Sequence, residues 1–370
     1  MSDDYTLHHG DCLEVLRAMP DASVDAVVTD PPYGLSNTSP RRVAETLGRW
    51  ASGDTEYVPA GRGFGDHSWD SFVPPPAVWE ECLRVLKPGG HLMVFAGART
   101  HDLMGMSVRL AGFDVRDSVA WIYSSGFPKG QDLGRQIDKK LGAEREVVGT
   151  YMGASNIGKK ADGKWGYVPG QGANPGADRS VPITVPATEE AKRWDDWSSQ
   201  LRPSHEPVVV ARKPFKGSLV DNVMEHGTGA FNVGATRIPL VDGEKTYGPS
   251  MEKGRWPANV IMDEHEAQHL EEQRPGISRR FHSFVYENKV PVSKRPTVTR
   301  ADGTRVQHPT VKPLALMEHL VALVTPPGGV VLDPFAGSGT TLEAARNLGM
   351  QPVGVEQSAD YCALIHERMD

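Results

Sequence analysis

The hydrophobic and polar positions of this chain follow patterns that are typical of strands and helices in alternation. Short apolar runs predict buried strands, and apolar residues three or four apart predict amphipathic helices. Near the start of the chain, strands are predicted at residues 5–10, 25–29, 91–96 and 115–123, and helices at 12–19, 76–86 and 100–110. Near its end, strands are predicted at 329–333 and 352–356, and helices at 314–324, 340–348 and 359–369. This alternation indicates an α/β fold with a doubly wound mixed sheet, mostly parallel.

Between these two halves the pattern breaks. Residues 35–70 are rich in Gly, Ser, Arg, Asp and Pro and predict a mobile loop. Residues 205–300 offer only short strand candidates, at 207–211, 260–262 and 281–286. We therefore expect one domain that is split in sequence into 1–125 and 306–370. Residues 126–305 are expected to form an inserted, irregular α+β region that lies outside the sheet.

Composition excludes several classes of protein. The 370 residues contain no apolar run of the roughly 20 residues that a membrane helix needs. The acidic N-terminus lacks a signal sequence, so we expect a cytoplasmic protein. The three cysteines lie far apart and form no CxxC motif, which argues against a zinc site and a disulfide framework. No metal is expected.

The charge distribution favours a nucleic-acid partner only weakly. The net charge is −7, but residues 128–305 hold 27 Lys and Arg against 23 Asp and Glu. Candidate phosphate contacts are basic clusters within this region, although a solvated surface is the better explanation for each of them. The clusters are Lys159-Lys160, Arg212-Lys213 with Lys216, Arg279-Arg280 and Lys294-Arg295.

A glycine turn between a strand and a helix predicts a nucleoside-cofactor site. Gly337 and Gly339 follow the strand at 329–333 and permit a tight turn and close backbone approach. The turn lacks the lysine of a phosphate-binding P-loop and the third glycine of a dinucleotide site. Glu356 ends the next strand, where a carboxylate can accept hydrogen bonds from ribose hydroxyls. A cofactor without phosphates suits this turn.

A second motif, Asp30-Pro31-Pro32-Tyr33-Gly34, follows the strand at 25–29. Paired prolines cannot continue a strand, so the motif lies on a loop at the strand's carboxyl end, where open α/β sheets bind ligands. The Asp30 carboxylate and the Pro31 carbonyl can accept hydrogen bonds from an amino group. The two prolines hold that carbonyl rigidly, and Tyr33 offers a flat ring for stacking. The motif predicts a site for an amino group on a planar ring.

Together with Asp333-Pro334-Phe335-Ala336-Gly337-Ser338-Gly339-Thr340-Thr341, this motif resembles the DNA amino-methyltransferases, and the order of the two motifs resembles the β class of that family. The resemblance covers residues 5–125 and 305–368. It implies a Rossmann-like methyltransferase fold that uses S-adenosylmethionine (AdoMet). Residues 1–125 are then the catalytic half, 306–370 the AdoMet-binding half and 126–305 the target-recognition region.

The resemblance also implies individual roles. Asp11 is expected to bind the cofactor's adenine amino group. Pro309, Thr310, Lys312, Asp333 and Phe335 are expected to line its methionine end, although Lys312 equally fits a surface lysine. Ala336, Ser338 and Thr340 complete the cofactor turn.

The implied activity is sequence-specific methylation of adenine N6 in double-stranded DNA, on a base flipped out of the helix. Aspartate at position 30 favours adenine, and cytosine N4 is the alternative. Methylation of RNA or of a protein amide, and a non-catalytic DNA-binding relative, are further alternatives. A bacterial, archaeal or phage origin, a homodimer and a separate cognate restriction endonuclease would fit, since the chain holds no nuclease motif.

Overall fold

The computed structural model describes residues 4–36, 38–61, 63, 68–124, 130–152, 157–159, 165–167, 180–240, 253–284, 296–300, 302–303, 305–308 and 310–370. The chain divides into two compact units. Unit 1 holds the described residues up to Ser124 and those from His205 onward. Unit 2 holds the described residues from 130 to Ser204. Within the described residues, no helix has both the length and the apolar content that a membrane crossing requires.

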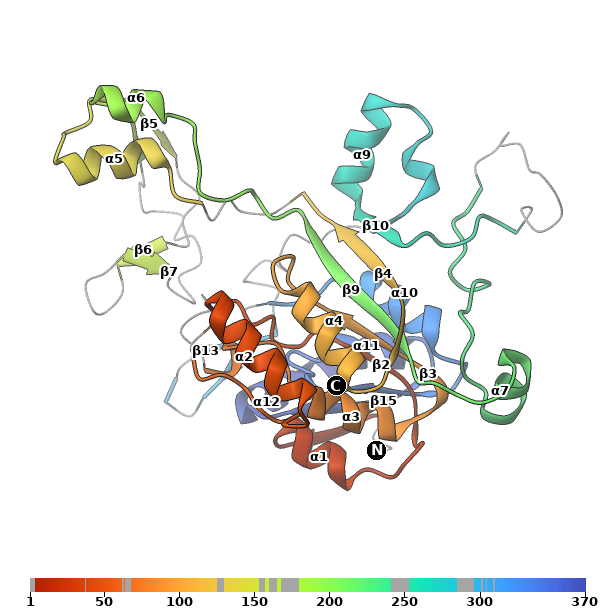
Figure 1. Ribbon diagram of the computed structural model, residues 1–370. Helices are drawn as coiled ribbons and strands as arrows, with labels where there is room; N and C mark the ends of the chain where they lie inside the picture. Colours follow the sequence, from red (N-terminus) through yellow and green to blue (C-terminus); the bar gives the residue numbers. More distant parts are fainter. Residues whose placement is uncertain are drawn as a thin grey trace. The chain divides into compact units, whose positions relative to one another are not determined.

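Unit 1 is built on one nine-stranded sheet (Figure 1). Its strand order is β1-β15-β14-β2-β3-β9-β4-β10-β11. All neighbouring pairs are parallel except the two that β9 makes, with β3 and β4. The strands are β1 (Thr6–His9), β2 (Val24–Thr29), β3 (Leu86–Phe95), β4 (Asp114–Ile122), β9 (His205–Arg212), β10 (Val260–Asp263), β11 (His282–Phe284), β14 (Val330–Asp333) and β15 (Gln351–Glu356). The predicted doubly wound, mostly parallel mixed sheet is confirmed.

Both faces of this sheet are buried, as its nearly continuous apolar strands require. Along β3, Leu92 and Val94 join one core cluster, whereas Met93 and Phe95 join the other. The first face is covered by α1 (Cys12–Ala18), α2 (Pro40–Ala51), α3 (Pro76–Val85) and α4 (His101–Leu110). The opposite face is covered by α10 (Leu314–Val324), α11 (Thr340–Asn347) and α12 (Ala359–Met369).

The expectation that residues 126–305 lie outside the sheet is wrong for three segments. The predicted strands at 207–211, 260–262 and 281–286 exist as β9, β10 and β11, and all three belong to the main sheet. Residues 285 and 286 lie outside the described residues. β9 is buried between β3 and β4 because Val208, Val209 and Val210 fill both faces. Hydrophobic burial on two sides therefore places it in the sheet interior.

The predicted loop at 35–70 is wrong for its central part, which forms the helix α2. Ser39 accepts a hydrogen bond from Arg42 N, and Pro40 occupies the first helical position, as at many helix starts. Trp50 is buried and donates to Tyr57 O at 2.8 Å, which fixes the end of this helix on unit 1. The 3-10 helix at Ser68–Asp70 follows.

The remaining elements lie outside the sheet. Unit 1 also contains α7 (Leu219–His226), α9 (Glu264–Gln273), a 3-10 helix at Ser278–Arg280, and the short pair β12 (Val298–Thr299) and β13 (Arg305–Val306). Unit 2 contains α5 (Leu133–Leu141), α6 (Glu189–Arg193) and the antiparallel pairs β5 (Val147–Met152) with β8 (Ser180–Thr184) and β6 (Ile157–Lys159) with β7 (Trp165–Tyr167). Buried Asp138 holds unit 2 together by accepting from Thr188 N at 3.1 Å and pairing with Arg145 at 3.1 Å.

Candidate active site

The two motifs predicted from the sequence lie along one edge of the sheet. β1, β15, β14 and β2 are neighbouring parallel strands, so their carboxyl ends lie side by side. Asp11 follows β1, Glu356 ends β15, the glycine turn follows β14, and Asp30 follows β2. This is the edge at which open α/β sheets bind ligands.

The glycine turn is held by backbone hydrogen bonds and leaves little space above it. Gly339 N donates to Ala336 O at 2.7 Å, and Ala336 N donates to Val355 O at 2.9 Å. Gly337 and Gly339 have φ of +54° and +80°, which glycine adopts without strain. A Cβ on Gly337 would lie 3.0 Å from the His308 ring. The turn therefore requires glycine for both its conformation and its close contacts.

Glu356 is tied to this turn by two backbone donors. Its Oε2 accepts from Gly337 N at 2.9 Å and its Oε1 accepts from Ser358 N at 2.8 Å. Burial raises the pKa of Glu356, although these backbone donors oppose the shift. Each carboxylate oxygen keeps a second lone pair, so the group can still accept hydrogen bonds from a diol.

Asp11 lies beside Glu356, because Gly10 N donates to Glu356 O at 3.0 Å. The carboxylate of Asp11 caps α1 by accepting from Leu13 N at 2.9 Å through Oδ1. Asp11 is exposed. The strand ends thus bring two carboxylates to one side of the glycine turn.

A buried hydrogen bond joins the catalytic strand to the cofactor strand. Thr29 Oγ1, at the end of β2, donates to Asp333 Oδ1, at the end of β14, at 2.6 Å. Phe335 N donates to the same carboxylate oxygen at 3.0 Å. Burial raises the pKa of Asp333 from 3.8 to about 6, although the bonds from Thr29, Thr341 and Phe335 oppose the shift. A buried hydrogen bond therefore links the ends of the two strands that precede the motifs.

The loop that carries Tyr33 is fixed on both sides. Thr100, at the start of α4, donates from its side chain to the Tyr33 carbonyl at 2.6 Å and makes no cap hydrogen bond to the helix. Gly34 N donates to the Asp70 carboxylate at 2.8 Å. A Cβ on Gly34, whose φ is +65°, would lie 2.6 Å from the backbone at Phe72. Only glycine fits this position, so the loop has one conformation.

Lys312 lies at the centre of this site. Its ammonium donates to Asp30 Oδ2 at 2.7 Å and to the Tyr33 hydroxyl at 2.9 Å, and it lies 3.1 Å from Glu206 Oε2. Tyr33 OH donates to the same Glu206 oxygen at 2.7 Å. The ammonium also lies 4.8 Å from the centre of the Phe95 ring. The side chain is 10% exposed, so these contacts replace most of its hydration.

The charges of this cluster set its protonation. Burial lowers the pKa of Lys312, but Asp30 and Glu206 outweigh burial, and the net effect raises the pKa above 10.5. Burial, Asp30 and Glu206 together raise the pKa of Tyr33 well above 10. Lys312 is therefore a cation and Tyr33 a neutral phenol at neutral pH.

The two oxygens of Asp30 differ in their surroundings. Oδ2 is held by Lys312, whereas Oδ1 is buried and accepts no hydrogen bond from any described residue. An unsatisfied buried carboxylate oxygen is costly, and a native protein keeps one where a ligand supplies the donor. Asp30 Oδ1 is therefore an acceptor open to a ligand, on the carboxylate that Lys312 links to the Tyr33 hydroxyl.

The chain matches the family model N6_N4_Mtase, described as DNA methylase, over residues 24–367. The chain belongs to this family. M.HindIII of Haemophilus influenzae, a type II methyltransferase, is 23% identical to this methylase over 95% of this chain and 91% of its own. M.HpaI of Haemophilus parainfluenzae is 22% identical over 99% of this chain and 74% of its own. Among solved structures, the M1.HpyAVI–SAM complex is 16% identical with a TM-score of 0.44, covering 99% of each chain.

All but one of the other predicted site residues of the methylase lie within the described part of the chain. Pro31 is buried and Pro32 is partly buried between Asp30 and Tyr33. Ser338 and Thr340 are buried at the start of α11, and Thr310 is exposed. Pro309 lies outside the described residues. Lys312, expected at the methionine end of the cofactor, contacts Asp30 and Tyr33, which carry the predicted amino-group site.

Glu206 is the residue of this cluster that sequence reasoning missed. It is the second residue of β9, and β9 runs antiparallel to β3 and β4. The amino end of an antiparallel strand lies at the carboxyl edge of its neighbours, so Glu206 reaches the site. In the sequence, Glu206 is marked only as an acidic residue directly before the apolar run 207–211. Its place at the site cannot be inferred until the direction of that strand is known.

Of the four predicted basic clusters of the methylase, one makes contacts within unit 1, one is exposed, and two lie wholly or partly outside the described residues. Lys213 donates to Leu86 O at 2.7 Å, and Arg212 stacks on Phe215 with its guanidinium 4.8 Å from the ring centre. Arg279 and Arg280 are exposed. Lys160, Lys294 and Arg295 lie outside the described residues, as does the side chain of Lys159.

Trp194 and Trp197 of unit 2 are exposed and form an edge-to-face pair.

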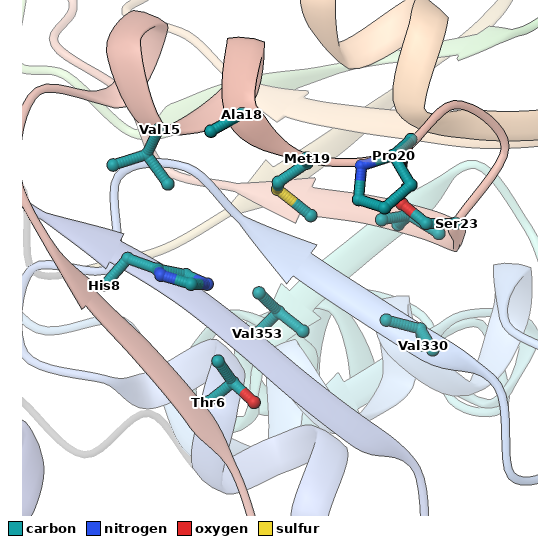
Figure 2. Close-up of a pocket in the computed structure, with 10 residues that line it drawn as sticks. Thr6, His8, Val15, Ala18, Met19, Pro20, Ser23, Val330 and Val353 are labelled. Carbon is teal, nitrogen blue, oxygen red and sulfur yellow. Dashed lines mark hydrogen bonds between the residues drawn. The ribbon is translucent and has the colours of Figure 1, made fainter.

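An apolar hollow of about 400 Å³ lies elsewhere on unit 1 (Figure 2). Val24 and Val330, which line it, are the first residues of β2 and β14, so it opens toward their amino ends. Met19, after α1, and Thr6 and His8, on β1, are among the other residues that line it. The hollow contains none of the predicted catalytic or cofactor residues and is not part of the candidate active site.

Proposed function

We propose that this methylase transfers a methyl group from AdoMet to adenine N6 of a base flipped out of double-stranded DNA. The observation that carries the proposal is Asp30 Oδ1, which is buried and accepts no hydrogen bond from the described residues, on the same sheet edge as the glycine turn. A nucleobase amine offers the N–H donor that this oxygen lacks. The Tyr33 ring offers a face for the base.

The residues of the glycine turn fit AdoMet. Gly337 and Gly339 let the backbone approach a ligand closely, and the carboxylates of Glu356 and Asp11 provide acceptors for hydroxyl and amino groups. The turn itself, residues 333–341, contains no lysine. AdoMet carries no phosphate that would need one. When bound, AdoMet supplies an electrophilic methyl group on a sulfonium. The cluster of Asp30, Glu206 and Lys312 carries a net negative charge, which favours a cation nearby.

Asp30 acts on the amine in two ways. By accepting an N–H bond through Oδ1, it draws the nitrogen lone pair out of the ring and makes it available for bonding. After the nitrogen has gained a methyl group it must lose a proton, and Oδ1 is placed to accept it. Because Lys312 pairs with Oδ2, Oδ1 is the oxygen of Asp30 that is left open to the amine.

Aspartate as the first residue of the motif favours adenine over cytosine, and cytosine N4 is the second candidate. Unit 2 and the described residues 253–284 are the proposed target-recognition parts, since they lie outside both motifs. A second copy of the chain and a cognate endonuclease remain predictions.

The proposal is tested by incubating the protein with AdoMet and unmethylated genomic DNA, followed by mass spectrometry of the nucleosides. We expect N6-methyladenine from the wild-type protein and none from Asp30→Ala. Methylation confined to cytosine N4 would replace adenine by the second candidate. No methylated nucleoside, with AdoMet and DNA both bound, would refute the proposal.

A further inference from the structure

Glu206 contacts two groups of the site, the Tyr33 hydroxyl and the Lys312 ammonium. Its Oε2 accepts from Tyr33 OH at 2.7 Å and lies 3.1 Å from the Lys312 ammonium. The side chain of Glu206 is 21% exposed and that of Lys312 is 10% exposed. Two hydrogen-bonded charges this well shielded interact strongly, since solvent screens them little.

In this arrangement each of the three N–H donors of the Lys312 ammonium has an acceptor. An ammonium has three N–H donors. The three acceptors around Lys312 are Asp30 Oδ2, Tyr33 OH and Glu206 Oε2, at 2.7, 2.9 and 3.1 Å. With all three in place the ammonium has one position, in which it engages Asp30 through Oδ2 alone. Without the charge of Glu206, the attraction that holds the ammonium at Oε2 is weaker, and Asp30 Oδ1 is a buried oxygen that accepts no hydrogen bond from the described residues.

We propose that Glu206 is a positioning residue for methyl transfer. It orients Tyr33 by its hydroxyl and holds Lys312 away from Asp30 Oδ1, so that this oxygen stays open to the target amine. The inference rests on the proposed function for the identity of the substrate. β9 is the element that makes this possible, because its antiparallel direction brings Glu206 to the edge where Asp30 lies.

The test is Glu206→Gln in the full-length protein, which keeps the size of the side chain and removes its charge. The matched control is Asp114→Asn, because Asp114 pairs with Arg212 at the opposite end of β9, with 3.9 Å between the charged atoms. We expect Glu206→Gln to lower the single-turnover rate of methylation about 10- to 100-fold, the effect of one charge-assisted hydrogen bond. AdoMet and DNA affinities and the melting temperature should match those of Asp114→Asn, whose rate should match the wild type.

A rate within twofold of the wild type in Glu206→Gln would overturn the inference. So would a rate loss that is explained by weaker AdoMet or DNA binding or by a melting temperature well below that of Asp114→Asn. If wild-type protein leaves no methylated nucleoside, the proposed function fails. If wild-type protein methylates DNA and Glu206→Gln is equally fast, only the present inference fails.

A second variant, Tyr33→Phe, keeps the inference testable if Glu206→Gln does not fold. It removes the hydroxyl that donates to Glu206 and leaves the ring in place. We expect Tyr33→Phe alone to be slower than the wild type. Where Glu206→Gln does fold, we expect the double variant to be no slower than the slower single variant, because both changes break one network. A fully active, folded Tyr33→Phe, or rate losses that multiply in the double variant, would contradict the proposed positioning.

Discussion

At the scale of single residues, the site depends on the different surroundings of the two Asp30 oxygens. One oxygen is held by Lys312 and the other is buried without a described donor. Both the aspartate and the tyrosine of the motif were predictable, because the paired prolines mark a loop at a strand's carboxyl end. Glu206 was not, because its position depends on the direction of a strand that has no motif of its own. The partners of Lys312 could not be predicted either, because they lie far from it in the sequence and meet it only in the folded chain.

We predict that Asp30→Ala abolishes methyl transfer and leaves AdoMet binding intact. The change removes the acceptor for the target amine, and proton acceptance and N–H polarisation together are worth at least about 100-fold in rate. The glycine turn and Glu356 are not touched by it. Calorimetry with AdoMet and a methylation assay on the same preparation check both parts. Residual activity above one tenth of the wild type would show that Asp30 is not the acceptor.

Gly34 should tolerate alanine far less well than Gly328, although both have similar backbone angles, with φ of +65° and +71°. A Cβ at Gly328 meets nothing within 4 Å, so Gly328→Ala should cost about 1–2 kcal/mol of unfolding free energy. At Gly34 the Cβ meets backbone at 2.6 Å, which should add about 1–3 kcal/mol. Urea unfolding of both variants measures the difference. Equal stabilities would mean that the loop after Tyr33 can move aside.

At the scale of elements, the strand–helix pattern predicted the positions of β1, β2, β3, β4, β14 and β15 because their apolar runs are buried on both faces. α2 was missed because the Gly- and Pro-rich flanks of 35–70 hid its spacing. Its cap Ser39, first-turn Pro40 and the apolar positions Val43, Leu47 and Trp50 were present in the sequence. The place of β9 in the sheet was not predictable, since strand order is a tertiary property.

The link between β2 and β14 gives a pH-dependent prediction for Asp333→Asn. The pKa of Asp333 is about 6 when folded and near 3.8 when unfolded, so the unfolded chain loses this proton first. The stability contributed by this group therefore falls as pH rises from about 4 to about 6, by roughly 3 kcal/mol. Asparagine cannot ionise. Urea unfolding between pH 4 and 7.5 should show Asp333→Asn gaining on the wild type as pH rises, and a pH-independent difference would contradict the pKa.

The burial of β9 predicts a large effect of charge at Val210. This side chain is 2% exposed, whereas Val220 on α7 is 66% exposed. An unpaired buried carboxylate in place of Val210 should destabilise unit 1 by more than about 3 kcal/mol. Val220→Asp should change stability by less than about 0.5 kcal/mol. Thermal unfolding compares the two variants. A stable, folded Val210→Asp would show that β9 is not an interior strand.

At the scale of the whole molecule, unit 1 contains every described residue of the candidate site. The chain leaves unit 1 after Ser124 and returns at His205, and these ends are close because Ile122 pairs with His205. The motif order predicted a domain of two sequence halves, 1–125 and 306–370, whereas unit 1 also contains the described residues from His205 to 284. The return of the chain through β9, β10 and β11 was not predictable, because short apolar runs do not reveal which sheet they join.

Replacing residues 130–200 with a short Gly/Ser linker should therefore leave unit 1 folded and able to bind AdoMet. The paired ends of β4 and β9 need only a short connection. We expect AdoMet affinity close to that of the full chain and loss of site-specific methylation. Calorimetry and sequencing of methylated DNA measure these two properties. An insoluble product would contradict the expectation that unit 1 folds without these residues, and retained sequence specificity would contradict the assignment of recognition to unit 2.

The most direct test of the central claim follows an isotope. Wild-type protein is incubated with AdoMet carrying a deuterated methyl group and unmethylated genomic DNA, and the nucleosides are analysed by mass spectrometry. The account predicts a labelled methyl group on deoxyadenosine at N6, absent with Asp30→Ala. Label found only on deoxycytidine, or no labelled nucleoside while AdoMet and DNA both bind, would contradict it.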